Sequence, residues 1–176
     1  MEPRTPRLTS TTAILTRLVE DPDDLAAHPD KYVVDLFADE DHAEKAWLRA
    51  GTPHHFSYND GVITLMWDGV QLLGIPEWDD IVILWIYLVN VVEGYLVTGR
   101  GHDYFPDQPT PIILERIRGG ALITIGETKL RVDPLVFCRE LLDEAERFWQ
   151  WVDRHEVPVS RGDQGIDRIR ALIPRY

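Results

Sequence analysis

One local pattern occurs twice in this chain, and it constrains the fold more than any other feature of the sequence. Each copy has two glycine-containing turns between alternating apolar runs, followed by a proline at the start of a long apolar stretch. Corresponding positions lie 58 or 59 residues apart: Gly61 and Gly120, Asp68 and Gly126, Pro76 and Pro134. Asx-Gly and Gly-Gly turns between such runs predict hairpins, because glycine accepts the positive φ that these turns need. The pattern therefore predicts two strand–strand–strand–helix units.

The expected strands and helices follow from this pattern. The strands cover residues 54–58, 62–67, 70–73, 111–118, 121–125 and 128–132. The two helices cover residues 76–96 and 134–155. The second helix has an apolar stripe and a charged face, which is typical of a helix lying on a sheet. The first is apolar on almost every side, so it is expected at the centre of the fold or in a dimer interface.

These elements predict a single α+β domain over residues 1–176, with a mainly antiparallel sheet of about six strands and the two long helices packed on it. Short helices are expected at both ends, among them 11–20, 39–50 and 165–173. The domain divides into an acidic helical segment, a first unit, a loop, a second unit and a basic C-terminal helix, at residues 1–52, 53–97, 98–110, 111–156 and 157–176.

Negative charge is concentrated near the N-terminus. The chain has a formal net charge of −12, and ten acids with a single base, Lys31, lie between Glu20 and Glu44. Charge of this density attracts basic partners and repels polyanions. The sequence therefore argues against nucleic acid or an anionic membrane as a ligand and favours a basic protein.

We expect the residues that bind this partner to combine carboxylates with an aromatic anchor, because protein interfaces use both. The candidates come from the two acidic helical stretches: Asp21, Asp23, Asp24, Asp39, Glu40, Asp41, Glu44 and Trp47. The arginines of the C-terminal helix could instead neutralise these acids within the fold or across a dimer.

A loop at residues 98–110 is the candidate for an enzyme site. His102 could act as a general base, with Asp103 or Asp107 orienting its ring. Glu93 on the apolar helix could be a carboxylic acid with a raised pKa, or a structural partner of Arg100, Arg116 or Arg118. The same loop is also explained by helix termination and a turn, because glycine and arginine are common after a helix C-terminus.

The remaining motifs exclude several classes of chemistry. The chain has one cysteine, Cys138, and no zinc-type spacing, P-loop or nucleophile elbow. No metal site and no cofactor are expected. The N-terminus lacks the apolar region of a signal peptide, and the apolar run 81–89 is shorter than a membrane span. These features favour the cytoplasm.

The sequence thus predicts a non-catalytic, acidic protein-binding module. An immunity or antitoxin-type inhibitor from a bacterium, which masks a basic toxin, fits the size and charge. The alternatives are a small enzyme built around His102, Asp103 and Asp107, and an oligomerising accessory subunit that uses the apolar helix, in which case a homodimer is expected.

Overall fold

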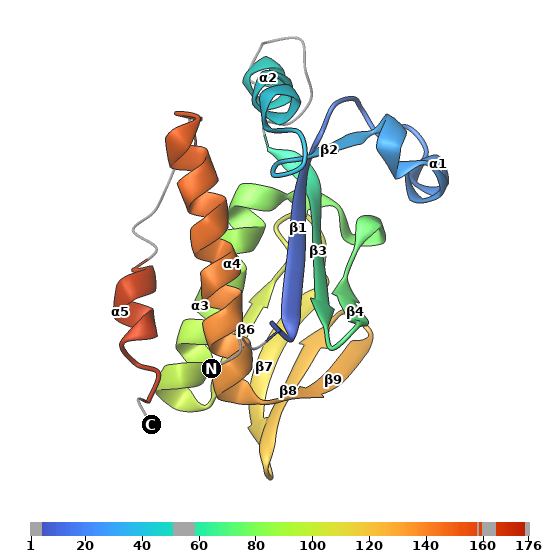
Figure 1. Cartoon of the computed structure of the whole chain (residues 1–176). Coiled ribbons are helices and arrows are strands. Elements are labelled where there is room, and N and C mark those ends of the chain that lie inside the picture. The colour runs from blue at the N-terminus through green and yellow to red at the C-terminus, as the bar shows by residue number, and fades with distance from the viewer. Residues whose placement is uncertain (1–4, 51–58, 158, 160–164, 175–176) are drawn as a thin grey trace.

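In a computed structural model the chain folds into two antiparallel sheets and five α-helices within the described residues, which are 5–50, 59–157, 159 and 165–174. The α+β class is therefore confirmed. The expected single six-stranded sheet is replaced by a sheet of five strands and a sheet of four. Figure 1 shows α3 and α4 side by side against the sheets, with α1 and α2 at one end of the molecule.

The first sheet has the order β2-β1-β3-β4, and β5 pairs with the first residues of β3. Its strands are β1 (Leu8–Leu15), β2 (Val33–Asp35), β3 (Asp60–Trp67), β4 (Val70–Leu73) and β5 (Asp79–Asp80). The predictions for β3 and β4 are confirmed. The strand expected at 54–58 lies outside the described residues.

Strand β1 replaces the helix expected over residues 11–20. Alternate side chains of β1 face α4 (Pro134–Arg154): Leu8 and Ile14 are buried, and the Ser10 hydroxyl donates to Glu144 at 2.6 Å. This spacing of two residues is the signature of a strand. The helical spacing of Ile14, Leu15, Leu18 and Val19 overlaps the end of that strand, and it does not continue into a helix.

The second sheet has the order β6-β7-β8-β9, all antiparallel. Its strands are β6 (Arg100–Tyr104), β7 (Pro111–Ile117), β8 (Gly120–Ile125) and β9 (Thr128–Val132). The three strands predicted at 111–132 are confirmed as β7, β8 and β9. The segment expected as a loop at 98–110 contains β6, which pairs with β7 along its whole length.

Helix α3 (Ile81–Thr98) lies on β6 at very short range. A Cβ added to Gly101 of β6 would lie 1.7 Å from the carbonyl oxygen of Val91. The helix begins later than expected, because the Asp80 side chain caps it by accepting from the Ile83 amide at 2.9 Å. Pro76 instead lies in a short 3-10 turn, Ile75–Glu77. Gly99 ends the helix with a φ of 86°, as expected for a glycine C-cap.

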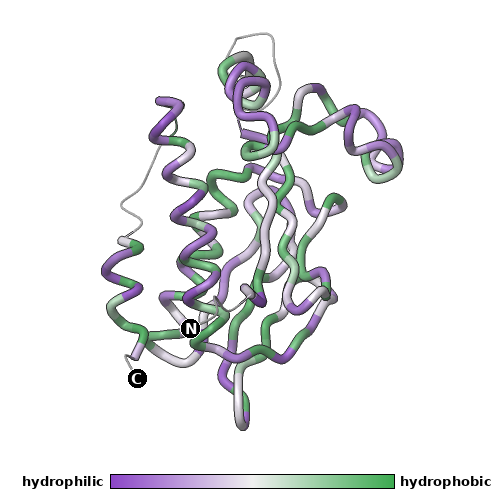
Figure 2. The backbone as a smooth tube through the Cα atoms, in the orientation of Figure 1, coloured by the Kyte–Doolittle hydropathy of each residue, from purple (hydrophilic) through white to green (hydrophobic). Residues whose placement is uncertain are grey.

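Helix α3 is also long and apolar enough to cross a membrane, with a mean hydropathy of 1.9 over an 18-residue window. Half of that window is buried inside the fold, and the core helix of a globular domain passes the same test. In Figure 2 α3 is coloured mostly hydrophobic, whereas α4 alternates between hydrophilic and hydrophobic residues. Helix α4 begins at Pro134 behind the Asp133 cap, as predicted.

One large core joins both sheets to α3 and α4, and Trp67, Trp85 and Phe148 are among its fully buried side chains. A separate small core of Leu15, Leu25 and Tyr32 lies under α1 (Pro22–Ala27). The remaining helices are α2 (Glu40–Ala50) and α5 (Ile166–Arg170), close to the predictions of 39–50 and 165–173. The acidic segment therefore carries its own minor core at one corner of the molecule.

Candidate protein-binding surface

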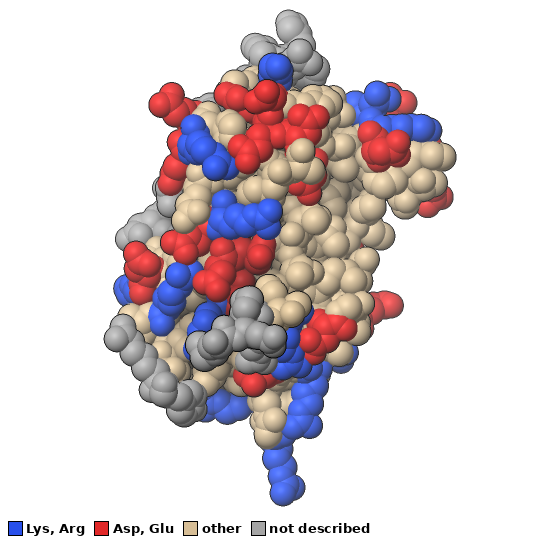
Figure 3. All heavy atoms as spheres, viewed as in Figure 1, with Lys and Arg blue, Asp and Glu red and all other residues tan. Residues whose placement is uncertain are grey.

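The acidic segment forms the end of the molecule that carries α1 and α2. Figure 3 shows Asp and Glu atoms gathered where α2 meets the end of α4, and again along α4. Lys and Arg atoms gather at the opposite end, around the β7–β8 hairpin. We call the surface formed by residues 20–44 the acidic surface. The charge asymmetry of the sequence is thus an asymmetry of the folded molecule.

In the part around α1, several acids serve the local structure. Asp21 caps α1 by accepting from the Asp23 amide at 2.9 Å. Asp24 accepts from the Tyr32 hydroxyl at 2.6 Å and lies 2.8 Å from the His28 ring, with Lys31 at 3.5 Å. The Tyr32 hydrogen bond lowers the pKa of Asp24 and raises the pKa of Tyr32. Asp24 is therefore a structural carboxylate that is already neutralised locally.

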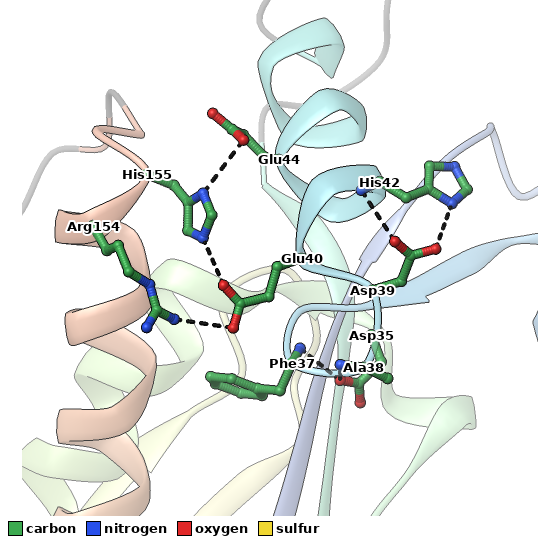
Figure 4. A network of polar contacts seen from close by, with 9 residues as sticks. All are labelled: Asp35, Phe37, Ala38, Asp39, Glu40, His42, Glu44, Arg154 and His155. Atoms are coloured by element: carbon green, nitrogen blue, oxygen red, sulfur yellow. Dashed lines mark hydrogen bonds and ion pairs between the residues drawn. The ribbon is translucent and has the colours of Figure 1, made fainter.

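In the part around α2, two carboxylates fasten the helix to the end of α4 (Figure 4). Glu40 lies 3.1 Å from Arg154 Nη2 and 3.1 Å from His155 Nε2. Glu44, one turn along α2, lies 3.4 Å from the other ring nitrogen of His155. Below these charges the Trp47 ring stacks on Trp151, with centroids 5.5 Å apart. Ion pairs and aromatic packing together hold α2 in place.

Trp47 was expected as an exposed aromatic anchor for a partner, and the structure shows it as a core residue. Its side chain is 3% exposed, and its indole N–H donates to Asn59 Oδ1 at 3.1 Å. The sequence could not separate these two roles, because a tryptophan next to acids suits either. The exposed apolar side chain on the same helix is its neighbour Leu48, which is 48% exposed.

Four acids of the acidic surface are exposed and have no ion pair or side-chain hydrogen bond with another described residue: Glu20, Asp23, Asp30 and Asp41. Asp39 is exposed as well, and its ion pair is with His42 on the same helix, at 3.6 Å. These carboxylates remain in water and contribute their full charge to the field at this end of the molecule.

The C-terminal arginines that the structure describes are bound elsewhere. Arg168 of α5 donates to Glu93 of α3 at 2.6 Å, and Arg170 lies 2.9 Å from both Asp143 and Glu146 of α4. Their role is to fasten α5 to the two long helices. Within the fold, the acids of this segment contact Arg154 and His155 at the end of α4 and, locally, Lys31.

The residues proposed for an enzyme site are distributed over two elements and a turn. His102 and Asp103 are neighbours on β6, so their side chains point to opposite faces of the sheet. The exposed His102 ring contacts Tyr104 edge to face at 4.8 Å. Asp107 lies in the turn after β6. No hydrogen bond or ion pair joins His102 to either aspartate within the described ranges.

Glu93 lies apart from that histidine, on α3. Its hydrogen bond with Arg168 lowers its pKa, which is the opposite of a raised-pKa general acid. The structural ion pair expected for this residue is present. Its partner is Arg168 rather than Arg100, Arg116 or Arg118.

Two polar residues of the structure were missed by sequence reasoning. Asp79 is 3% exposed, and burial raises the pKa of its carboxyl group. It accepts from the Asp80 and Asp107 amides and so ties the β6–β7 turn to β5. His155 was missed because its partner Glu40 lies 115 positions away in the sequence. For Asp79 a signal existed, since an aspartate next to a helix cap inside an apolar stretch requires partners.

Other chemistry finds little support in the described part of the chain. Burial raises the pKa of the Cys138 thiol to about 12, so this cysteine is not a thiolate nucleophile. No group of three or more His, Cys, Asp or Glu is placed to hold a metal ion among the described residues. An open cleft of about 620 Å³ between α4 and α5 is lined by two arginines and two aspartates, so it carries no net charge: Arg139, Arg170, Asp143 and Asp167.

Comparison with known proteins finds no relative of this chain. No family model, no curated protein and no solved structure matches the chain. The fold and the acidic surface define the chain as an α+β module with one strongly acidic end.

Proposed function

We propose that this chain is a non-catalytic binding module whose acidic surface binds a basic protein in the cytoplasm. The class that fits best is an immunity or antitoxin-type inhibitor. Such a protein would place carboxylates in a cationic groove that the partner uses for phosphates, and so would block the partner from nucleic acid.

The observation that carries this proposal is the set of exposed carboxylates that have no cationic partner among the described residues, at Glu20, Asp23, Asp30 and Asp41. They lie on the short helices α1 and α2 and on the links around them. A cluster of like charges costs stability through self-repulsion, and a cationic partner removes that cost. The surface therefore gains from a basic ligand more than from water and salt.

The residues of the acidic surface divide into two groups with different roles. Glu40, Glu44 and Asp24 are used within the fold, because each contacts a basic side chain of this chain. Glu20, Asp23, Asp30 and Asp41 have exposed side chains and are the carboxylates that we assign to the partner. Asp21 combines both roles, since it caps α1 and is exposed. Leu48 supplies the exposed apolar contact area in place of Trp47.

The test is a triple variant that replaces three of these carboxylates by neutral amides: Asp23→Asn, Asp30→Asn and Asp41→Asn. A basic partner would first be isolated by native capture on the immobilised chain. Its association rate would then be measured with purified proteins at low and physiological salt. We expect the variant to lower the low-salt association rate about tenfold and to flatten its salt dependence, because long-range attraction sets the rate of charged encounters.

The matched control removes the same number of negative charges elsewhere, with Asp107→Asn, Glu127→Gln and Asp167→Asn. These side chains are exposed and lie outside the acidic surface. The control should change the association rate by less than the test variant. Equal effects of the two variants would show that net charge alone matters, and an unchanged rate in the test variant would remove the acidic surface from the interface.

A second function, an oligomerising accessory subunit, is favoured by one face of α3. Ile83, Ile86 and Tyr87 are only partly buried and lie on one face of the helix, and Val97 further along is 64% exposed. The exposed Asn90 lies between them, so this apolar surface has two parts. Sedimentation at several concentrations separates the two functions, because a stable homodimer supports this one and a monomer that binds the basic partner supports the first. The enzyme hypothesis is tested by His102→Ala in any assay that shows activity.

A further inference from the structure

The contact between α2 and α4 is centred on one imidazole. His155 ends α4, and its side chain is 13% exposed. Its Nε2 lies 3.1 Å from Glu40 and its Nδ1 lies 3.4 Å from Glu44, so both ring nitrogens face carboxylates (Figure 4). The ring lies against Trp151, with centroids 4.4 Å apart. A carboxylate therefore occupies each of the two polar directions of the ring.

The contact from Nε2 to Glu40 is a hydrogen bond and the contact from Nδ1 to Glu44 is a longer ion-pair contact, so the neutral and the protonated ring meet the two carboxylates differently. A neutral imidazole carries one N–H and one lone pair, whereas the imidazolium ion carries two N–H donors. Ionised carboxylates only accept hydrogen bonds. With two carboxylates in place, the imidazolium ion can donate a proton to each of them. The neutral ring can donate to only one carboxylate and turns a lone pair toward the other. Histidine is the side chain whose ordinary titration falls between pH 5 and 8.

We propose that His155 is a pH-sensitive latch that fixes the start of α2 to α4. The protonated ring holds Glu40 and Glu44 together. When the ring loses a proton, it keeps the shorter contact from Nε2 to Glu40, and Glu44 separates from Nδ1. The latch is closed while the ring is protonated and opens when the ring loses its proton, because only the imidazolium ion has an N–H donor for each carboxylate.

The remaining groups around the latch limit how far it opens. Arg154 contacts Glu40 at 3.1 Å and does not titrate in this range, so it keeps that carboxylate in place. Trp47 stacks on Trp151 and Phe148 in the core. The C-terminal half of α2 is thus anchored at any pH. The change is confined to the first turns of the helix, and it returns the charge of Glu44 to the acidic surface.

The test is amide hydrogen exchange over α2 at about pH 5.5 and about pH 8, on either side of the ordinary histidine range. Rates are expressed as protection factors, which remove the intrinsic pH dependence of exchange. We expect protection of the first turns of α2 to fall about threefold at the higher pH, which is the scale of a partly exposed ion pair. The core of β3 should show no such change.

Two variants separate the latch from other titrations. His155→Gln should abolish the pH-dependent loss of protection, because glutamine does not titrate. Glu44→Gln should also abolish it, since the glutamine amide donates to the lone pair of the neutral ring. His42→Gln is the matched control: His42 lies on the same helix, is exposed and pairs with Asp39 at 3.6 Å, and its replacement should leave the loss of protection intact.

Constant protection in the unmodified chain would overturn the proposal. A threefold loss that persists in His155→Gln would also overturn it, because another group would then be responsible. A loss that persists in Glu44→Gln but disappears in His155→Gln would overturn the assignment of Glu44 as the carboxylate that is released. None of these results depends on a partner, so the proposed binding function stands or falls separately.

Discussion

At the scale of single residues, one close approach of helix to strand is made possible by the absence of a side chain. Gly101 of β6 lies under α3, where an added Cβ would come within 1.7 Å of the Val91 carbonyl oxygen. Gly94 of α3 faces the same strand, and its added Cβ would lie 3.0 Å from the Gly101 Cα. The helix therefore rests on the strand backbone rather than on a layer of side chains.

We expect Gly101→Ala to destabilise the fold by about 3 kcal/mol or more, because the clash is with backbone and α3 must move away from the sheet. Gly69→Ala is the comparison. Gly69 has a φ of 79° but no atom within 4 Å of the added Cβ, so its cost is that of the left-handed conformation, about 1 kcal/mol. Urea denaturation of both variants measures the difference, and equal losses would contradict the close-approach argument.

Local chemistry at single positions was predictable from the sequence, and pairing over long separations was not. The proline at the start of α4 and the glycine at the end of α3 were expected, because both roles depend on the neighbouring residues only. Glu93 was expected to pair with an arginine, yet Arg168 lies 75 positions away. Three other arginines were equally plausible from the sequence, and only the folded position of α5 decides among them.

At the scale of elements, α2 joins the body of the molecule through a few large contacts. Trp47 enters the aromatic layer formed by Phe148 and Trp151 of α4, and Ala43 of the same helix is fully buried. The helix also contacts β1 and β2. The next residue along the helix, Leu48, points into solvent. The two neighbours therefore make very different contributions to the position of the helix.

We expect Trp47→Ala to lower the free energy of unfolding by about 3–5 kcal/mol, because it leaves a large cavity in the aromatic layer. Leu48→Ala should change it by less than about 0.5 kcal/mol, as is usual for an exposed side chain. Thermal unfolding of the two variants provides the measurement. A small loss for Trp47→Ala would show that α2 contributes little to the cooperative unit.

Whether an element is a helix or a strand was predictable where the turn signals and the hydrophobic periodicity agreed. Strands β7, β8 and β9 and helix α4 have strong turn and cap signals, and all were expected. Strand β1 was mistaken for a helix because its final apolar residues also match a helical spacing, although the threonines before them favour a strand. Strand β6 was missed because Arg-Gly-His-Asp-Tyr contains no β-branched residue and pairs through its backbone.

At the scale of the whole molecule, the C-terminal segment is fastened to the core by charge. Arg168 and Arg170 link α5 to α3 and α4, and Ile169 is fully buried beneath them. The sequence correctly placed a basic helix at this end of the chain. The surface on which this helix packs was not predictable, because acids on α3, on α4 and in the N-terminal segment could all pair with its arginines.

The Glu93–Arg168 ion pair gives this attachment a pH dependence. The pKa of Glu93 is lowered by the Arg168 hydrogen bond, so the stabilisation is present above the ordinary glutamate pKa and is lost as the pH falls through the lower folded-state value. Glu93→Gln should cost about 0.2–1 kcal/mol at about pH 7 and less at about pH 3. Urea midpoints at both pH values, with Glu127→Gln as a control, test this. A cost that is the same at both values would contradict it.

The position of β1 has a consequence for how the chain is made. Strand β1 lies between β2 and β3, and Leu8, Ser10 and the preceding Arg7 contact Glu140 and Glu144 of α4, more than 130 positions later. A ribosome releases β1 well before α4. The growing chain therefore carries an incomplete apolar sheet until α4 has been made, and chains that stop before α4 should aggregate instead of forming a stable shorter domain.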